Sequence, residues 1–189
     1  MDDATDEKVA ARVQAGDVKS FDILIERYEK KLKRYARRFL FKDDADDIVQ
    51  EVFIKTYINI NSFDAGKKFS SWIYRIAHNE FINAIKKKKT EKILFFDLDL
   101  LFPHPAARDS ADSEAINSSL RLMLDKCLDK ISAKYREPLV LYYYEDLNYK
   151  EISEILHIPA STVGVRLARG KAILKKKVKE IDPTYEQPK

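Results

Sequence analysis

Hydrophobic residues in the first part of the chain recur every three or four positions, which is the spacing of one face of an α-helix. The pattern predicts a helix from about Val18 to Phe41, after a short one that ends at Gly16. Its apolar positions are Phe21, Leu24, Ile25, Tyr28, Leu32, Tyr35 and Phe39. Arg and Lys fill the other face from Lys30 to Arg38, which is most simply a solvated surface.

Two further amphipathic helices are expected before residue 90. The first follows Asp43 or Asp44, either of which can cap it, and its buried stripe is Ala45, Val49, Val52, Phe53 and Ile60. The second runs from about Ser70 to Lys88, with Ser70 or Ser71 as its cap and with Ile73, Ile76, Ala77, Phe81 and Ile85 toward the core. Between them, residues 61–68 break the pattern, and 64–66 predict a turn.

The composition changes at residues 90–116, and we interpret this segment as a linker. Pro103 and Pro105 interrupt any regular element there. The apolar residues between Leu94 and Phe102 alternate with polar ones, which predicts an extended chain.

The last part of the chain predicts a helix-turn-helix. After a stripe of Leu120, Leu124, Cys127, Leu128 and Ile131, a helix is expected over 135–144 with Pro138 in its first turn. Asn148 and Glu151 have the spacing of a capping box that opens a short helix. Residues 157–160 end it, and Ser161 is expected to cap a longer basic helix that reaches about Lys179. The alternative is a helical hairpin whose basic face is only solvated.

These elements predict an all-α fold of two small helical domains, residues 1–89 and 117–181, joined by an extended linker over 90–116 and followed by a tail over 182–189. Only four glycines among 189 residues fit this class. The single cysteine, Cys127, excludes an internal disulfide and is expected in the core. No apolar run approaches the ~20 residues that span a bilayer, so we expect no membrane insertion and a cytoplasmic protein.

Charge is distributed unevenly and indicates two kinds of partner. Residues 43–64 hold six acids and one base, whereas residues 65–92 hold eight bases and two acids. Asp47, Gln50 and Glu51 form an acidic and amide patch on the first of these segments. Taken alone, that patch is either favourable charge placement near a helix N-terminus or a binding site.

The basic segments suit nucleic acid. Trp72, Tyr74 and Arg75 precede Asn79, Asn83 and the lysines 86–89, so aromatic rings lie among cations as in surfaces on which unpaired bases stack. Trp and Tyr are usually partly buried, so a core position is the simpler interpretation of Trp72 or Tyr74. Residues 160–179 hold seven bases and no acid, and Thr162, Arg166, Arg169 and Lys171 can meet DNA there.

The order of these motifs resembles that of the extracytoplasmic-function (ECF) sigma factors of bacterial RNA polymerase, in the sigma-70 family. Residues 20–89 are similar to region 2, through Asp46-Asp-Ile-Val-Gln-Glu-Val-Phe53 and Trp72-Ile-Tyr-Arg-Ile-Ala-His-Asn79. Residues 117–179 are similar to region 4, through Tyr149-Lys-Glu-Ile-Ser-Glu-Ile155 and Ser161-Thr-Val163. Gly164 and Val165 depart from the Arg or Lys and Ser or Thr that are common in the family, so direct base readout is weaker at these two positions.

The resemblance implies a role for each surface. Asp47, Gln50 and Glu51 would dock on the clamp helices of the largest catalytic polymerase subunit, and the loop 61–69 with Asn79 would hold a base flipped from the −10 element. The residues implied at the −10 element are Asn61, Ser62, Phe63, Lys67, Trp72, Tyr74, Arg75, Asn79, Asn83, Lys86 and Lys87. Those implied at the −35 element are Ser161, Thr162, Val165, Arg166, Arg169 and Lys171.

We therefore expect a promoter-specificity subunit that binds core RNA polymerase and promoter DNA, and not an enzyme. An anti-sigma factor is a further partner that the resemblance suggests. The alternative is a free-standing helix-turn-helix regulator, which binds duplex DNA unaided. The three histidines lie on separate elements, and the chain has no glycine-rich phosphate loop, so we expect no cofactor and no metal.

Overall fold

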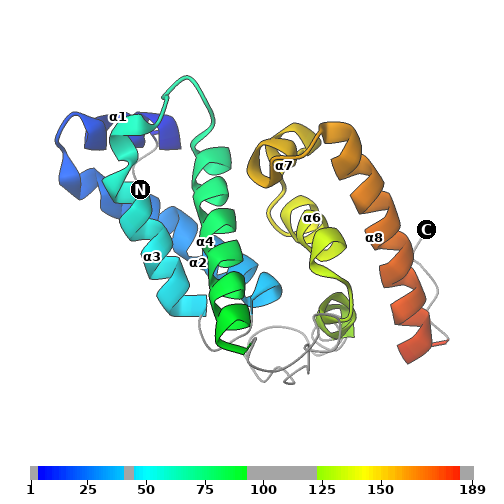
Figure 1. The fold of residues 1–189 in the computed structure, drawn as a ribbon. Helices are drawn as coiled ribbons and strands as arrows, with labels where there is room; N and C mark the ends of the chain where they lie inside the picture. The colour runs from blue at the N-terminus through cyan, green and yellow to red at the C-terminus, as the bar shows by residue number, and fades with distance from the viewer. Residues whose placement is uncertain (1–3, 41–44, 93–122, 184–189) are drawn as a thin grey trace, which may run out of the picture.

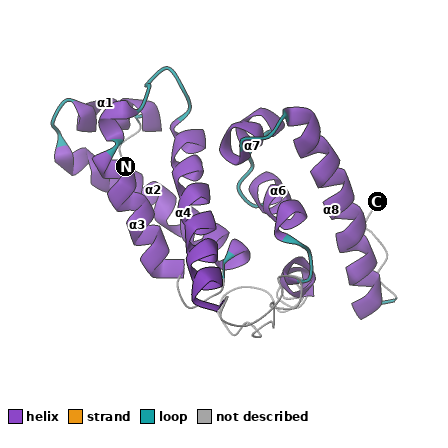
Figure 2. Cartoon of the chain, viewed as in Figure 1, coloured by secondary structure: helices purple, strands orange, loops and turns teal. Residues whose placement is uncertain are grey.

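The structure, a computed structural model, describes residues 4–40, 45–92 and 123–183, and the described residues are helical with no strand among them (Figures 1 and 2). The N-terminal half contains α1 (Asp6–Gln14), the 3-10 turn η1 (Val18–Ser20), α2 (Phe21–Phe39), α3 (Ala45–Ile58), η3 (Ile60–Ser62) and α4 (Phe69–Lys92). The C-terminal half contains a short helix over 123–129, then α6 (Ala133–Tyr143), α7 (Tyr149–Leu156) and α8 (Ala160–Ile181). The predicted all-α architecture is confirmed.

Most of the expected linker lies outside the described residues, as do Asp43, Asp44 and Leu120. Residues 90–92, expected in the linker, belong to α4. Ile60 is buried, but it lies in η3 and not in α3. The preceding helix ends where the Asn59 side-chain amide donates to the carbonyl oxygen of Lys55 at 2.8 Å.

Several predicted helix starts are wrong, and at one of them, α4, a contact distant in sequence replaces the expected cap. α4 begins at Phe69, ahead of both serines, and the Phe69 amide donates to the Glu7 carboxylate on α1 at 3.1 Å. α8 begins at Ala160 after Pro159, so Ser161 lies inside the helix. α6 begins at Ala133, which makes Pro138 its sixth residue.

The capping box at the start of α7 is confirmed. The Asn148 side chain accepts from the amides of Lys150 and Glu151 at 3.0 and 3.1 Å, and the Glu151 carboxylate accepts from the Asn148 amide at 2.8 Å. At the other end of α7, His157 has a left-handed backbone, and the Ser153 hydroxyl donates to the Ile158 carbonyl at 2.6 Å. These bonds fix the tight turn that places α8 across α7.

An aromatic core holds the N-terminal half together. The Tyr35 ring on α2 packs against Tyr74 and Phe81 on α4, with ring centres 5.7 and 4.9 Å apart. Tyr28 packs edge-on against Phe69 at 5.5 Å. Side chains of this size contribute large apolar areas, so α2 and α4 together form the scaffold on which α3 lies.

The C-terminal half depends on a close approach of α6 and α8. A Cβ at Gly170 would lie 3.0 Å from Cδ1 of Leu139 and 3.1 Å from the carbonyl oxygen of Tyr135. The absence of a side chain at Gly170 therefore allows the two helices to touch. Cys127 is buried, as expected.

The two halves contact each other, with α7 beside α4 and α6 beside α2 (Figure 1). Arg34 and Arg38 of α2 lie in this contact and pair with Glu145 and Asp125 at 2.8 and 3.2 Å. The prediction that the basic face of α2 is only solvated is therefore wrong for these two residues. Their partners lie about a hundred residues further along the chain, where no local pattern can reveal them.

Candidate functional site

The outer face of α3 presents an acidic cluster with apolar neighbours. The side chains of Asp47, Gln50 and Glu51 are all exposed, and none of them forms a hydrogen bond or ion pair with the part of the protein that the structure describes. Ile54 and Ile58 continue the same face at helical spacing, and they are 51% and 69% exposed. We call these five residues the α3 face.

Ile54 and Ile58 are not among the site residues predicted from the sequence, although their spacing distinguishes them from the core positions. They lie four residues apart and out of register with the buried stripe of α3 that contains Val49, Val52 and Phe53. Exposed apolar side chains that gather on one face are a feature of protein-binding surfaces. The α3 face thus combines acidic, amide and apolar side chains that are all exposed to solvent.

The loop between α3 and α4 is held in shape by α1. Nε2 of Gln14 donates to the carbonyl oxygens of Ile60 and Phe63, both at 2.8 Å. Within the loop, the Asp64 carboxylate accepts from the Gly66 amide at 2.9 Å. Asn61, Ser62 and Lys67 remain exposed on this fixed loop.

Of the aromatic residues expected at the −10 element, Phe63 and Tyr74 are buried, at 5% and 2% exposure, so neither can contact DNA directly in this arrangement. The Phe63 ring supports the half-buried Trp72, with ring centres 5.2 Å apart. Tyr74 donates its hydroxyl to Glu145 at 2.5 Å across the contact between the halves. Among the three aromatic residues expected at the −10 element, Trp72 is therefore the one with an accessible surface.

The rest of the predicted α4 residues share one side of the helix. Asn79 and Asn83 are exposed four residues apart, and Lys86 and Lys87 follow them on the surface. Arg75 is half-buried and lies one turn before Asn79. Helical spacing places this side nearly opposite Tyr74, away from the C-terminal half.

The predicted DNA-facing residues of α8 lie along its first four turns. Ser161, Val165, Arg169 and Lys171 are exposed, while Thr162 and Arg166 are half-buried. A Cβ at Gly164 would meet only the Tyr149 ring, at 3.5 Å, so the site has room for a side chain. The nearby Arg169 guanidinium lowers the pKa of the Tyr135 phenol.

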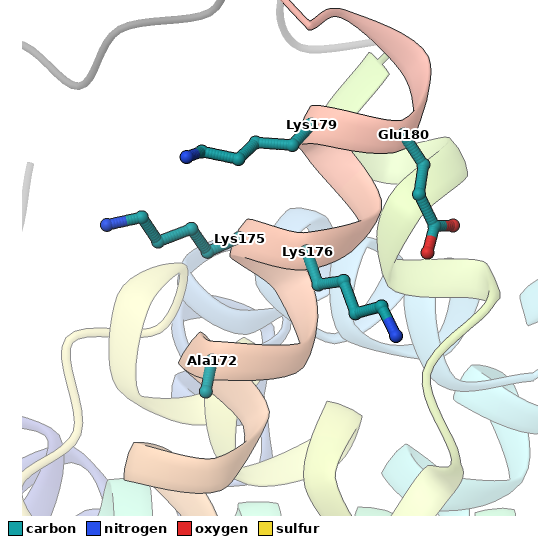
Figure 3. Close-up of a pocket in the computed structure, with 5 residues that line it drawn as sticks. All are labelled: Ala172, Lys175, Lys176, Lys179 and Glu180. Carbon is teal, nitrogen blue, oxygen red and sulfur yellow. The ribbon is translucent and has the colours of Figure 1, made fainter.

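Lysines continue along the second half of α8. A shallow hollow there is lined by Ala172, Lys175, Lys176, Lys179 and Glu180. Lys175 and Lys179 point to one side of it, and Lys176 and Glu180 point to another (Figure 3). Glu180 pairs with Lys177 at 2.8 Å, and this hydrogen bond lowers the pKa of its carboxyl group. The surface suits phosphate groups and has no enclosed site for a small molecule.

Neither a metal site nor a membrane-spanning helix is found among the described residues. No group of three or more His, Cys, Asp or Glu side chains there could hold a metal ion. Likewise, none of the described helices is long and apolar enough to cross a membrane.

Comparison with known families agrees with this arrangement. Sigma-70 region 2 matches residues 24–91, and sigma-70 region 4 matches residues 121–174. The first match covers the α3 face and nearly all of α4, and the second covers α6, α7 and most of α8.

Two curated relatives match nearly the whole chain. The ECF RNA polymerase sigma factor SigW of Bacillus subtilis is 36% identical over 177 residues, which cover 90% of this chain and 95% of that protein. The ECF RNA polymerase sigma-E factor of Haemophilus influenzae is 31% identical over 183 residues, or 94% of this chain and 97% of that protein. The chain belongs to the ECF sigma factors of the sigma-70 family.

Solved structures share the fold. The sigma factor RpoE of Bartonella quintana, in complex with the anti-sigma factor NepR, matches with a TM-score of 0.74 and 24% identity over 87% of this chain and 99% of that one. CnrH, in complex with the cytosolic domain of CnrY, matches with a TM-score of 0.67 and 22% identity over 95% of this chain and 99% of that one.

Proposed function

We propose that this protein is the promoter-specificity subunit of RNA polymerase for a set of promoters with their own −10 and −35 elements. In this role it binds core polymerase, recognises both elements and melts the DNA at the −10 element, and it catalyses no reaction itself. The observation that carries the proposal is the combination of the exposed acidic and apolar α3 face with two basic surfaces on separate helices, α4 and α8. Because polymerase and promoter DNA are its partners, it acts in the cytoplasm.

The α3 face is the proposed polymerase contact. Its exposed carboxylates supply charge complementarity, and Ile54 and Ile58 supply apolar area. A protein that only binds DNA has no use for such a surface, because carboxylates repel phosphates.

The side of α4 that carries Asn79 is the proposed −10 surface. A flipped base needs an amide to read its polar edge and an aromatic face to stack on, and Asn79 and Trp72 provide these groups on one helix. The exposed loop residues Asn61, Ser62 and Lys67 lie before the start of α4, and Lys86 and Lys87 would hold the strand through its phosphates. Phe63 and Tyr74 keep supporting roles.

α8 is the proposed −35 helix, entering the major groove with its N-terminal turns. Thr162 and Arg166 are the main candidates for base contacts, with Ser161 and Val165 beside them. Arg169, Lys171 and the lysines further along α8 would act on phosphates, so affinity for the −35 element should fall steeply with salt.

The competing function is a free-standing helix-turn-helix regulator. The two are separated by gel shifts on promoter DNA with the protein alone, with core polymerase alone and with both. We expect a specific shift only when both are present, and RNA synthesis from the shifted complex. A specific, high-affinity shift by the protein alone, unchanged by polymerase, would favour the free-standing regulator.

An anti-sigma factor is proposed as a third partner. Its support is the fold shared with RpoE of Bartonella quintana, which is in complex with the anti-sigma factor NepR. Affinity purification of the tagged protein from its own cells, with and without added core polymerase, tests this. A specific co-purified protein that polymerase displaces is the expected result.

A further inference from the structure

One carboxylate borders the proposed −10 surface of α4. Glu80 directly follows Asn79, and it precedes Asn83 by three residues and Lys87 by seven, so its side chain lies next to the side of the helix that carries these residues. It is the only acid in the sequence between Phe69 and Lys87. A DNA strand bound along this side of α4 would therefore pass close to one negative charge.

The structure pairs this carboxylate with a lysine from another helix. Nζ of Lys55, in the last turn of α3, donates to Oε2 of Glu80 at 2.6 Å. The side chain of Glu80 is only 15% exposed, whereas that of Lys55 is 43% exposed. The pair therefore connects α3 to α4, and the lysine is its more accessible member.

Lys55 has a second carboxylate within one helical turn, and it does not pair with that one. Glu51 lies four residues before Lys55, a spacing at which Glu and Lys commonly form an ion pair on a helix. In the structure Lys55 binds Glu80 instead, and Glu51 stays unpaired among the described residues. This pairing keeps the α3 face acidic and places the positive charge beside α4.

An unpaired carboxylate at position 80 would oppose DNA binding on α4. The repulsion between a carboxylate and phosphates extends over about one Debye length, which is ~10 Å at ~0.1 M salt. Because Glu80 is mostly buried, water screens this repulsion less than it would at a fully exposed site. An ion pair with lysine removes the net charge, so DNA can approach α4 without this repulsion.

We propose that Lys55 is a positioning residue of the −10 surface: it neutralises Glu80 and holds the carboxylate toward α3, so that on α4 the DNA strand meets only neutral and basic side chains. The identity of the ligand rests on the proposed function, whereas the ion pair does not. Lys55 acts through Glu80 and needs no contact of its own with DNA. The helix that carries the α3 face thus also adjusts the proposed DNA contact of α4.

Variants of the full-length chain separate this shielding from other roles. Lys55→Met leaves Glu80 charged and unpaired, so it should weaken binding of −10 DNA. Lys55→Met combined with Glu80→Gln removes both charges, and binding should return to nearly that of the wild type. Lys55→Arg keeps the ion pair and should keep the affinity. Lys30→Met is the matched control, because it removes the same charge from an exposed position on α2.

Fluorescence anisotropy measures how a labelled single strand with the preferred −10 sequence binds to each variant together with core polymerase. At ~50 mM salt we expect Lys55→Met to bind roughly three- to tenfold more weakly than the wild type and the control. At ~0.5 M salt the difference should fall below about twofold, because salt screens the repulsion. Urea unfolding shows whether each variant is folded, and Lys55→Gln replaces Lys55→Met if that variant is not.

The affinity of each variant for core polymerase is measured separately and should not change, because the α3 face keeps all five of its residues. Equal binding of the −10 strand by Lys55→Met and the wild type would overturn the proposal. A double variant that binds no better than Lys55→Met would overturn it as well, since Lys55 would then act on DNA or on the fold and not through Glu80.

Two further results would contradict the shielding role. A parallel loss of polymerase affinity in Lys55→Met would place Lys55 in the polymerase contact, and a changed base preference in Glu80→Gln would show that Glu80 reads a base. A wild-type protein that binds no −10 strand with polymerase present would instead count against the proposed function, and with it against the role of Lys55.

Discussion

The side-chain amide of Gln14 on α1 lies 2.8 Å from the carbonyl oxygen of Phe63, forty-nine positions further along the chain. The same nitrogen donates to the carbonyl oxygen of Ile60. The first helix of the protein thus sets the shape of the loop that precedes the proposed −10 surface, and the Phe63 ring in turn supports Trp72.

Replacing Gln14 by Glu should disturb this loop with little change in size. A carboxylate cannot donate to either carbonyl, so both hydrogen bonds are lost, and we expect a destabilisation of roughly 1–3 kcal/mol. Urea unfolding measures this loss, with Lys8→Gln on the exposed side of α1 as the control. Binding to single-stranded −10 DNA should weaken as well. Unchanged stability and binding would mean that the loop holds its shape without α1.

The α3 face should be required for polymerase binding. Asp47→Arg with Glu51→Arg should weaken binding to core polymerase at least tenfold, because the charge complementarity is reversed. Ile54→Ser should also weaken it, because apolar area is lost from the contact. The control is Asp22→Arg, which reverses an exposed carboxylate on α2. Equal affinities for the control and the α3 variants, measured by fluorescence anisotropy, would remove the assignment.

The two glycines of α8 should respond in opposite ways. At Gly164 an added Cβ meets only the Tyr149 ring at 3.5 Å, so Gly164→Ala should stabilise the helix by roughly 0.5–1 kcal/mol. At Gly170 it would press on Leu139 and on the Tyr135 carbonyl, so Gly170→Ala should cost roughly 1–3 kcal/mol. Thermal unfolding of the two variants measures both the expected gain and the expected loss in stability.

Gly164→Arg should increase affinity for the −35 element. A guanidinium in the first turns of the recognition helix adds a contact to base edges or phosphates, and we expect roughly a fivefold gain or more on preferred sequences. Gly164→Ala separates this contact from the gain in helix stability. Equal affinities of the Ala and Arg variants across −35 sequences would place residue 164 away from the DNA.

Three buried tyrosines should make the protein sensitive to high pH. Burial, followed by the nearby carboxylates of Asp6, Glu137 and Glu145, raises the pKa values of the Tyr28, Tyr35 and Tyr74 phenols above the usual ~10. The folded state therefore holds these protons more tightly than the unfolded chain does. The resulting stability is complete below pH ~10 and is lost progressively as the pH rises above it.

Absorbance of the phenolate form measures this effect. Of the ten tyrosines, these three should ionise only as the protein unfolds. Tyr74→Phe should remove one late phenol, whereas Tyr143→Phe, at a 54% exposed position, should leave all three late phenols in place. A single titration step near pH 10 in the folded protein would contradict the burial of all three.

The sequence predicts those parts of the fold that rest on local chemistry. The capping box of Asn148 and Glu151 and the apolar stripes of α2 and α3 follow from spacing within a few residues, and all were predictable. The start of α4 was not, because its first amide is bound by Glu7 from another helix. Arg34 was expected in solvent because its partner, Glu145, is 111 residues away and no local pattern reveals the pair.

The candidate surfaces were predicted less completely than the helices. Helical spacing places Asn79 and Asn83 on one side of α4, and the structure keeps both exposed. The same spacing cannot decide whether an aromatic residue faces solvent or a second domain, and Tyr74 and Phe63 are buried. Ile54 and Ile58 lie outside the predicted stripe, and spacing alone does not show whether another element covers them.

Run-off transcription with purified core polymerase on a library of genomic promoter fragments tests the central claim most directly. We expect the wild-type protein to start transcription at a defined subset that shares −35 and −10 motifs. Asn79→Ala should lose discrimination mainly at one position of the −10 motif, at a cost of roughly 1–3 kcal/mol. RNA no different from that made by core polymerase alone, with each protein correctly folded, would contradict the account.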